Sequence, residues 1–233
     1  MSNQENPSLA SKIAALAKEH PDATIKPIDN PNAAGAVQSC KVGFAVDMRD
    51  MADIYKGNTA LFRDVYQDVF TGGGDDLAYG GNCDDSFIMG EGDDVVYGGK
   101  GNDALAGWSG SDKLVGGEGD DQLGGFGEKD MLIGGSGNDA LDGGLNDDTL
   151  ILGPGRDIAV FAVHETYHES YFGNDIVKDF KARTGVPFAE QDKLVVNLFT
   201  DDNSKKMSYK SEIKDGNTIL TFYSDRSQSN PMG

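Results

Sequence analysis

Aspartates recur at a fixed interval of nine residues through the middle of the chain, and this spacing is the first sign of chemistry. Between residues 71 and 160 the sequence divides into ten nonapeptides without insertion or deletion, and glycine dominates their first four places. Place six is aspartate in every copy: Asp76, Asp85, Asp94, Asp103, Asp112, Asp121, Asp130, Asp139, Asp148 and Asp157. Glycine permits left-handed turns that other residues resist. Carboxylates beside turns that expose backbone carbonyls favour a hard ion such as calcium over zinc, which prefers nitrogen and sulfur.

Short strands must position these turns. Place eight is apolar in every nonapeptide: Ala78, Phe87, Val96, Leu105, Leu114, Leu123, Leu132, Leu141, Leu150 and Ala159. Because side chains alternate across a strand, we expect place eight to face a core and places seven and nine to face outward.

The pattern Gly-Gly-x-Gly-x-Asp-x-apolar-x resembles the RTX (repeats-in-toxin) family of calcium-binding repeats, over residues 71–160. The resemblance implies an all-β fold, a right-handed parallel β-roll in which two nonapeptides make one coil. It also implies several calcium ions, each held between turns one coil apart. Ten repeats predict about five coils, which rise roughly 4.8 Å each. Five turns in a row leave four gaps, so we expect a ceiling of about eight ions.

Alternate nonapeptides form two rows of turns, which differ in sequence. The first row, from Asp76 to Asp148, carries Trp108 and Phe126 in place two and Glu128 and Asn146 in place four. The second row, from Asp85 to Asp157, keeps more paired glycines. We predict more ions in the second row and an altered site near Glu128, because glutamate resists left-handed angles. Besides the ten aspartates, the predicted metal-binding residues are Gly80, Gly98, Gly116 and Gly134 in place one and Asn82, Lys100, Glu118 and Ser136 in place three.

The chain is predicted to have three parts: an N-terminal segment (residues 1–70), the roll (71–160) and a β-rich C-terminal cap (161–233). The spacing of Leu9, Ile13 and Leu16 predicts a short amphipathic helix that starts near Ser8 or Ser11 and ends at His20-Pro21. It would be either a cover for the roll's outer sheet or a mobile arm. Residues 21–36 are predicted to be a linker, and residues 37–48 alternate like a strand.

Both ends of the repeat region carry partial copies of the pattern. Val69 falls in place eight of an extrapolated copy in which Gln67 replaces aspartate, so this copy would continue the coil without metal. After the repeats, the segment that contains Gly173, Asp175, Ile176, Val177, Asp179 and Phe180 resembles the closing segment of RTX rolls. A strand at residues 192–199 and a hairpin across Lys214-Asp215-Gly216 would complete the cap.

Charge is concentrated in the repeats. The net charge is -19, and residues 71–160 hold sixteen Asp and three Glu against three Lys and one Arg, which is -15. Like charge at this density opposes folding unless cations neutralise it, so we expect the repeats to fold on binding calcium. The same charge argues against nucleic acid as a partner.

No apolar stretch is long enough to span a bilayer, and the start lacks the pattern of a cleaved signal peptide. The RTX resemblance implies an extracellular protein that leaves the cell by type I secretion. Cys40 and Cys83 are the two cysteines, either free or bridged to each other.

One motif suggests an enzyme. His164-Glu165-Thr166-Tyr167-His168 matches the HExxH signature of zinc peptidases, which requires a helix. Here the motif falls where a loop between strands is expected, and the remaining histidine is His20. We therefore predict no catalytic site, with a zinc metallopeptidase as the alternative.

The outer places of the roll suggest binding. An apolar outer ladder needs a cover, which would be the flanking segments, a dimer or another molecule. Trp108 and Phe126 occupy the same turn position one coil apart and are expected to stack. They serve either packing under a terminal segment or contact with a carbohydrate or protein. The predicted function is a secreted, non-enzymatic binding or adhesion module for extracellular polysaccharide or a surface protein. The alternative is an accessory module of a polysaccharide-modifying enzyme.

Overall fold

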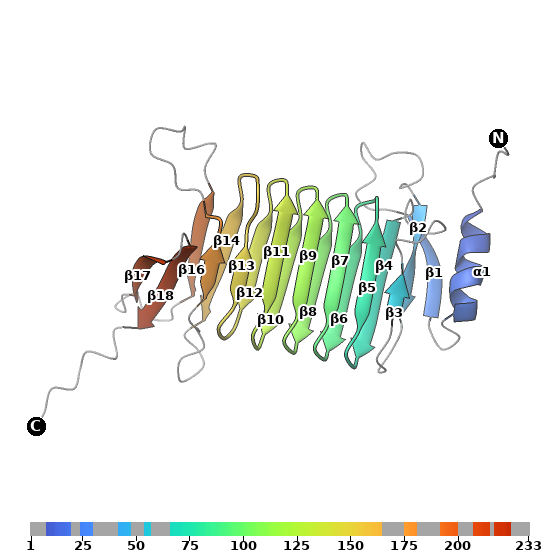
Figure 1. Cartoon of the computed structure of the whole chain (residues 1–233). Helices are drawn as coiled ribbons and strands as arrows, with labels where there is room; N and C mark the ends of the chain where they lie inside the picture. Colours follow the sequence, from blue (N-terminus) through green and yellow to red (C-terminus); the bar gives the residue numbers. More distant parts are fainter. Residues whose placement is uncertain are drawn as a thin grey trace, which may run out of the picture.

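The computed structural model describes residues 8–19, 24–29, 42–47, 54–56, 66–164, 175–180, 192–199, 207–214 and 217–224. Two nine-stranded sheets face each other along the molecule, and the short helix α1 (Leu9–Glu19) lies at the N-terminal end (Figure 1). Sheet A contains, in order, β1 (Thr24–Asp29), β2 (Val42–Asp47), β4 (Tyr66–Gly73), β6 (Ser86–Glu91), β8 (Ala104–Ser109), β10 (Gln122–Gly127), β12 (Ala140–Gly144), β14 (Ile158–His164) and β16 (Lys193–Phe199). Sheet B contains β17 (Met207–Lys214), β18 (Asn217–Ser224), β15 (Ile176–Lys178), β13 (Thr149–Ile151), β11 (Met131–Ser136), β9 (Lys113–Glu118), β7 (Val95–Lys100), β5 (Leu77–Gly81) and β3 (Ile54–Lys56).

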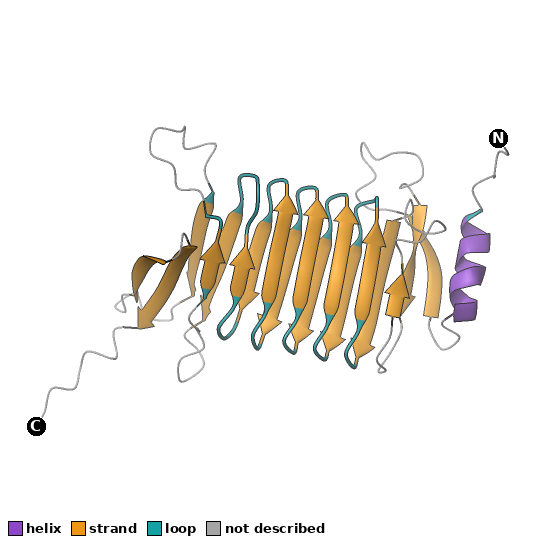
Figure 2. Ribbon diagram, in the orientation of Figure 1, coloured by secondary structure: helices purple, strands orange, loops and turns teal. Residues whose placement is uncertain are grey.

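Consecutive nonapeptides alternate between the two sheets, so each coil contains two of them. Leu123 of β10 pairs in parallel register with Leu105 of β8 and Leu141 of β12, each eighteen residues away. Short turns join the strands at both strand ends, along the two sides of the roll (Figure 2). The predicted all-β parallel roll is confirmed.

The place-eight residues form the core between the sheets. From Ala78 to Ala159 their exposed fractions do not exceed 3 %. A column of stacked Leu, Val and Phe side chains removes apolar surface from water in every coil, and each fully buried side chain stabilises the fold by about 1.5–3 kcal/mol.

The roll continues N-terminally past the repeats. Val69 of β4 is buried and pairs with Phe87, as predicted for a copy that continues the coil. β2 pairs in parallel with β4, and β3 with β5, so the sheets run through the predicted boundary at residue 70. The predicted strand in residues 37–48 is confirmed as β2. The linker predicted for residues 21–36 is partly wrong, because residues 24–29 form strand β1. This strand pairs antiparallel with β2 and is the edge strand of sheet A. Pro27 is tolerated there since an edge strand can lack one N–H donor.

Helix α1 caps the N-terminal end of the roll. The Ser8 side chain accepts the N–H of Ser11, which confirms Ser8 as the helix cap. Leu16 is buried against the core and Ile13 packs partly on it, and the helix contacts β1 and β2. Neither of the two alternatives, a cover for the outer sheet or a mobile arm, describes the helix: its apolar face closes the open end of the core instead. Within the described residues the outer ladder of sheet B stays partly exposed, with Met131 at 41 %.

The C-terminal end is extended by β15 and β16 and closed by a hairpin. β16 pairs in parallel with β14, and β15 with β13, so the sheets also run through residue 160. The predicted hairpin is confirmed: β17 pairs antiparallel with β18, from Met207–Ser224 to Lys214–Asn217. β18 then pairs antiparallel with β15.

Two further predictions involve residues near these ends. His164 is the last residue of strand β14, whereas Glu165 and His168 of the HETYH motif lie outside the described residues. The strand at His164 differs from the helix that a zinc-peptidase motif requires. Cys83 is disulfide-bonded, while Cys40, the chain's other cysteine, also lies outside the described residues.

Candidate metal centre

Left-handed backbone at places two and four shapes most of the turns. Gly99 and Gly101 have φ angles of 118° and 111°. A Cβ at either position would also strike the backbone of the preceding coil, at Gly81 and Cys83 respectively. Glycine is therefore required twice in a typical turn, both for its angles and for the close stacking of the coils.

The place-six aspartates are joined into two columns by hydrogen bonds to the backbone. From Asp94 to Asp157 the Oδ1 atom accepts the N–H of the equivalent aspartate one coil earlier; Asp103 N donates to Asp121 Oδ1 over 2.8 Å. The same bond is found from Asp76 to Asp94, Asp85 to Asp103, Asp94 to Asp112, Asp112 to Asp130, Asp121 to Asp139, Asp130 to Asp148 and Asp139 to Asp157. Each aspartate thus holds two coils in register and turns its other oxygen elsewhere.

That second oxygen, Oδ2, is buried without a hydrogen-bond partner in Asp94, Asp103, Asp112, Asp121, Asp130, Asp139 and Asp148. Burial raises the pKa of these carboxyls, and charged neighbours raise it further: to about 8 in Asp103 and Asp148 and to about 7 in Asp94 and Asp130. A buried carboxylate oxygen without a donor is costly. The negative charge of these buried carboxylates must therefore be neutralised, either by protons or by bound cations.

Backbone carbonyls of the next coil converge on the same space. A Cβ built on Gly134 would lie 2.5 Å from Asp139 Oδ2 and 2.7 Å from the carbonyl oxygen of Leu152. The equivalent pairs are Asp121 Oδ2 with Gly134 O, near Gly116, and Asp85 Oδ2 with Gly98 O, near Gly80. Carboxylate and carbonyl oxygens from two coils are the donor set that calcium takes. Within the described ranges no three His, Cys, Asp or Glu side chains form a metal-binding group, so carbonyls must supply much of such a site.

The structure places all the sequence-predicted residues in these turns. Gly80, Gly98, Gly116 and Gly134 border the Oδ2 atoms. The place-three side chains of Asn82, Lys100, Glu118 and Ser136 are exposed, so their carbonyls are what the turns use. The carbonyls of Glu118 and Ser136 each accept an N–H from the preceding coil, from Gly101 and Gly119. Their assignment as metal ligands stays a prediction.

First-row turns have the same arrangement, which the sequence interpretation left out. A Cβ on Gly125 would meet Asp130 Oδ2 and Gly143 O, and a Cβ on Gly143 would meet Asp148 Oδ2. The substitutions in places two and four of this row did not remove the carboxylate–carbonyl pair.

Three more residues extend the columns. Asp148 N donates to Asp175 Oδ1 and Asp157 N to Asp192 Oδ1, and both acceptors are buried. Each column therefore has one more aspartate than the ten repeats supply. At the other end, buried Gln67 takes the aspartate position: its N–H donates to Asp85 Oδ1 and its Nε2 to Asp85 Oδ2, over 2.8 and 3.4 Å. A carboxamide can satisfy Asp85 without a cation.

Place five forms a second, external ladder that the sequence analysis missed. In the second row Asp84, Asn102, Asp120 and Asn138 each accept, through Oδ1, the backbone N–H of the place-five residue one coil later. In the first row the ladder runs only from Asp75 through Asp93 to Ser111, and a Lys129–Asp147 ion pair of 3.0 Å follows farther along. The external ladder is thus more regular in the second row, and the larger number of ions expected in that row stays a prediction.

A solenoid of parallel strands with stacked glycine turns is a parallel β-roll, and its turns carry the oxygen donors that calcium takes. Comparison with known families agrees: the model described as RTX calcium-binding nonapeptide repeat (4 copies) matches residues 68–95, 88–123 and 124–159. The segment 68–159 therefore consists of RTX calcium-binding repeats. A search of curated proteins finds no significant match. Among the described helices none has the length and apolar character to span a membrane.

Glu128 is held at a left-handed backbone angle, φ 69°, in a turn place that is usually glycine. Its Oε2 accepts the N–H of Gly110 over 3.1 Å, which offsets part of the cost. We expect Glu128→Gly to raise the free energy of unfolding in calcium by about 1 kcal/mol, because a left-handed non-glycine residue costs roughly 1–2 kcal/mol. Urea unfolding at saturating calcium measures this.

The matched control is Glu91→Gly, which removes an exposed glutamate from place three, where φ is not positive. Glycine there only adds freedom to the unfolded chain, so this variant should be less stable than the parent. Equal effects of the two substitutions would contradict the strain argument.

Proposed function

We propose that the protein is a secreted calcium-binding roll that folds when it meets calcium outside the cell and then acts as a binding module. The observation that carries the proposal is the pair of columns of buried Oδ2 atoms without hydrogen-bond partners, each facing turn carbonyls. A folded chain with so many buried carboxylates needs compensating positive charge.

In this function the two carboxylate oxygens of each repeat aspartate have different roles. The aspartate Oδ1 atoms set the register of the coils, while the Oδ2 atoms and turn carbonyls would hold calcium, which supplies the missing positive charge. Because such sites require stacked coils, binding supplies free energy for folding. The disulfide state of Cys83 supports an oxidising compartment, as outside the cell.

Calcium titration of the purified chain, followed by far-ultraviolet circular dichroism, tests the proposal. In chelator the β signal of the repeats should be absent at neutral pH, and calcium should restore it in a cooperative transition. Isothermal titration calorimetry on the same samples should give several ions per chain. Magnesium at equal concentration is the control, since it requires tighter octahedral geometry and should restore less structure. An unchanged spectrum in chelator at neutral pH would refute the proposal.

We propose no enzymatic role for the HETYH segment. His164 ends a strand that is paired along its length with β16, through the His164–Phe199 pair. The zinc-peptidase motif requires a helix that carries both histidines, whereas its first histidine is part of a strand.

A further inference from the structure

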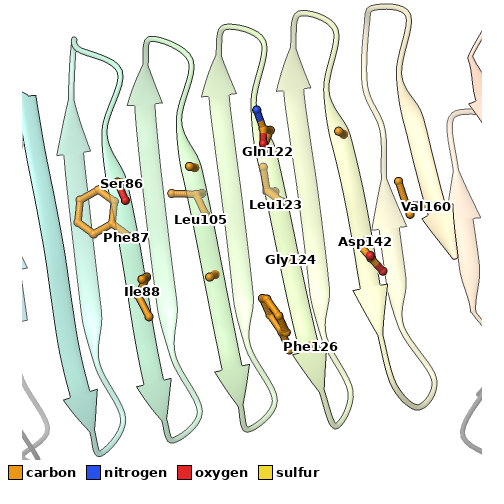
Figure 3. Close-up of a pocket in the computed structure, with 13 residues that line it drawn as sticks. Ser86, Phe87, Ile88, Leu105, Gln122, Leu123, Gly124, Phe126, Asp142 and Val160 are labelled. Carbon is orange, nitrogen blue, oxygen red and sulfur yellow. The ribbon is translucent and has the colours of Figure 1, made fainter. Parts of the chain in front are cut away.

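The outer face of sheet A carries a shallow groove that the calcium sites do not explain. It has a volume of about 420 Å³ and crosses five strands, β6 to β14 (Figure 3). Its middle is formed by Ala106 and Gly124, neighbours in the ladder that runs from Ile88 to Asp142. These small residues leave little side-chain bulk at the centre of the face, whereas the larger Ile88 and Val160 line its two ends.

The aromatic side chain of Phe126 lines this groove and stacks on Trp108, and both residues have a strained backbone. Trp108 and Phe126 have φ angles of 83° and 78° at a place where the repeat otherwise uses glycine. Their rings stack with centroids 5.3 Å apart, yet they remain 52 % and 50 % exposed. The Phe126 ring extends over Gly124, since a Cβ on that glycine would lie 3.0 Å from the ring. Left-handed aromatic residues that stay half-exposed gain little for the fold, and such strain is concentrated at functional positions.

The ends of this stack are open. In the strand register Trp108 follows Gly90, and Phe126 is followed by Gly144, so glycines flank the aromatic pair on both sides. No side chain from these two neighbouring positions covers the outer ring faces. A flat apolar ring face of a ligand could therefore pack on them.

The polar side chains that line the groove are Ser86, Gln122 and Asp142. Asp142 lies beside Gly124 in the ladder, and its carboxylate accepts the N–H of Gly144. Its Oδ1 atom is buried and has no hydrogen-bond partner. Among the lining residues, all of which the structure describes, Asp142 is the one ionisable side chain. The only charged group in the lining is thus an acceptor, which disfavours anions, while Ser86 and Gln122 can both donate and accept hydrogen bonds.

The groove is also periodic. It crosses successive strands that are about 4.8 Å apart, a step close to the length of one sugar unit in an extended β-linked chain. Backbone groups on this face are already paired within the sheet, so added strands of peptide have no free edge here. A polymer of flat, hydroxyl-bearing rings matches the spacing, the ring faces and the acceptor together.

We propose that this groove binds an uncharged glycan chain laid along the roll, with sugar rings packed on Trp108 and Phe126 and a hydroxyl donated to Asp142 Oδ1. The inference rests on the proposed function, because the groove exists only on the folded, calcium-loaded roll. It assigns the binding site and the class of polysaccharide: neutral, in contrast to uronate polymers, which the carboxylate and the net charge of -19 repel.

The test is calorimetric titration of the calcium-loaded full chain with cellohexaose and with chitohexaose, and with oligogalacturonate at excess calcium as the anionic comparison. At least one uncharged hexasaccharide should bind, and oligogalacturonate should bind more weakly. The double variant Trp108→Gly/Phe126→Gly should weaken binding by roughly tenfold or more, since each aromatic contact contributes about 0.5–1.5 kcal/mol. Its calcium midpoint should stay the same or fall, because glycine relieves the left-handed strain.

Two more variants sharpen the result. Tyr79→Thr/Tyr97→Thr removes the other stacked aromatic pair, on sheet B, and should bind glycan like the parent. Asp142→Asn keeps the shape of the side chain but removes its charge, and should weaken binding by roughly fivefold or more with folding intact.

The outcomes separate the two proposals, since circular dichroism reports folding on the same samples. A chain that folds with calcium but binds neither uncharged hexasaccharide at millimolar concentration overturns the glycan site and leaves the folding function standing. The glycan site is also overturned if oligogalacturonate or a lysine-rich peptide binds more strongly than the uncharged hexasaccharides. Glycan binding by the Trp108/Phe126 variant that equals that of the parent overturns it as well. Loss of calcium-dependent folding in that variant assigns the two rings to packing and also overturns the site. Failure of the parent to fold with calcium overturns both.

Discussion

Asp121→Ala is expected to raise the calcium concentration needed for folding by roughly a hundredfold or more. Asp121 lies in the middle of the second column, where its Oδ1 accepts the N–H of Asp103 and its Oδ2 faces the carbonyl of Gly134. The substitution leaves a buried N–H without an acceptor, at about 1–3 kcal/mol, and removes a charged oxygen from the ion site. The two losses add up to about 3 kcal/mol or more, which corresponds to that factor.

The adjacent residue supplies the control. Asp120→Ala removes the same chemical group one position away, on the exposed ladder, where Asp120 Oδ1 accepts the N–H of Asn138. Solvent can replace that acceptor, so its effect on the calcium midpoint should be less than about tenfold. Calcium titrations of both variants by circular dichroism measure the contrast. Equal midpoints for Asp120→Ala and Asp121→Ala would contradict the assignment of place six as the metal-binding position.

Acidification should substitute for calcium. In the calcium-free roll, burial raises the pKa of Asp103 and Asp148 to about 8 and of Asp112 and Asp121 to about 6, against 3.8 for an ordinary aspartate. The folded chain therefore binds protons more tightly than the unfolded chain between these values. The stabilisation is fully present below about pH 3.8 and is lost as the pH rises through about 6 to 8.

In chelator we accordingly expect β structure to appear as the pH is lowered from 8 to 5. If two or more protons are taken up, the folded-to-unfolded ratio changes by more than about tenfold per pH unit. In calcium, the fold should persist at pH 8, and the calcium midpoint should rise on acidification because protons compete for the same carboxylates. Circular dichroism across a pH series, with and without calcium, measures both effects. A calcium-free chain that is more structured at pH 8 than at pH 5 would contradict them.

The nine-residue period alone predicts the parts of the molecule in which geometry repeats. Place six had to face the turns and place eight the core, since any slip of register would turn Leu123 outward. The stacking of Trp108 on Phe126 followed from the same register and is confirmed. These positions were predictable because one interaction pattern recurs in every coil.

The ends were less predictable because the interval changes there. Asp175 lies 27 residues after Asp148, and Asp192 lies 35 after Asp157, so inserted segments hide the columns from a search at fixed spacing. A local signal existed for Asp192: residues 192–195 read DKLV, as do residues 112–115. The sequence contained no comparable signal for the position of α1, because an apolar helix face fits the end of the roll and its outer sheet equally well.

The groove could not be predicted either, since it depends on the lack of large side chains at the middle of the outer face of sheet A. Ala106 and Gly124 are unremarkable in a strand pattern, and Asp142 looks like an ordinary exposed place-nine residue. Only the stacked strands bring the small residues together beneath Phe126 and leave Asp142 Oδ1 without a donor.

The aspartate columns also have a direction. Every Oδ1 acceptor belongs to the coil nearer the C-terminus, and every N–H it satisfies belongs to the coil before it. A partly assembled stack therefore exposes unequal ends: bare amide donors at its C-terminal surface and surplus carboxylate at its N-terminal surface. Both unequal ends are closed in the complete chain: Asp175 and Asp192 accept the last amide donors, and the carboxamide of Gln67 donates to the first carboxylate of its column.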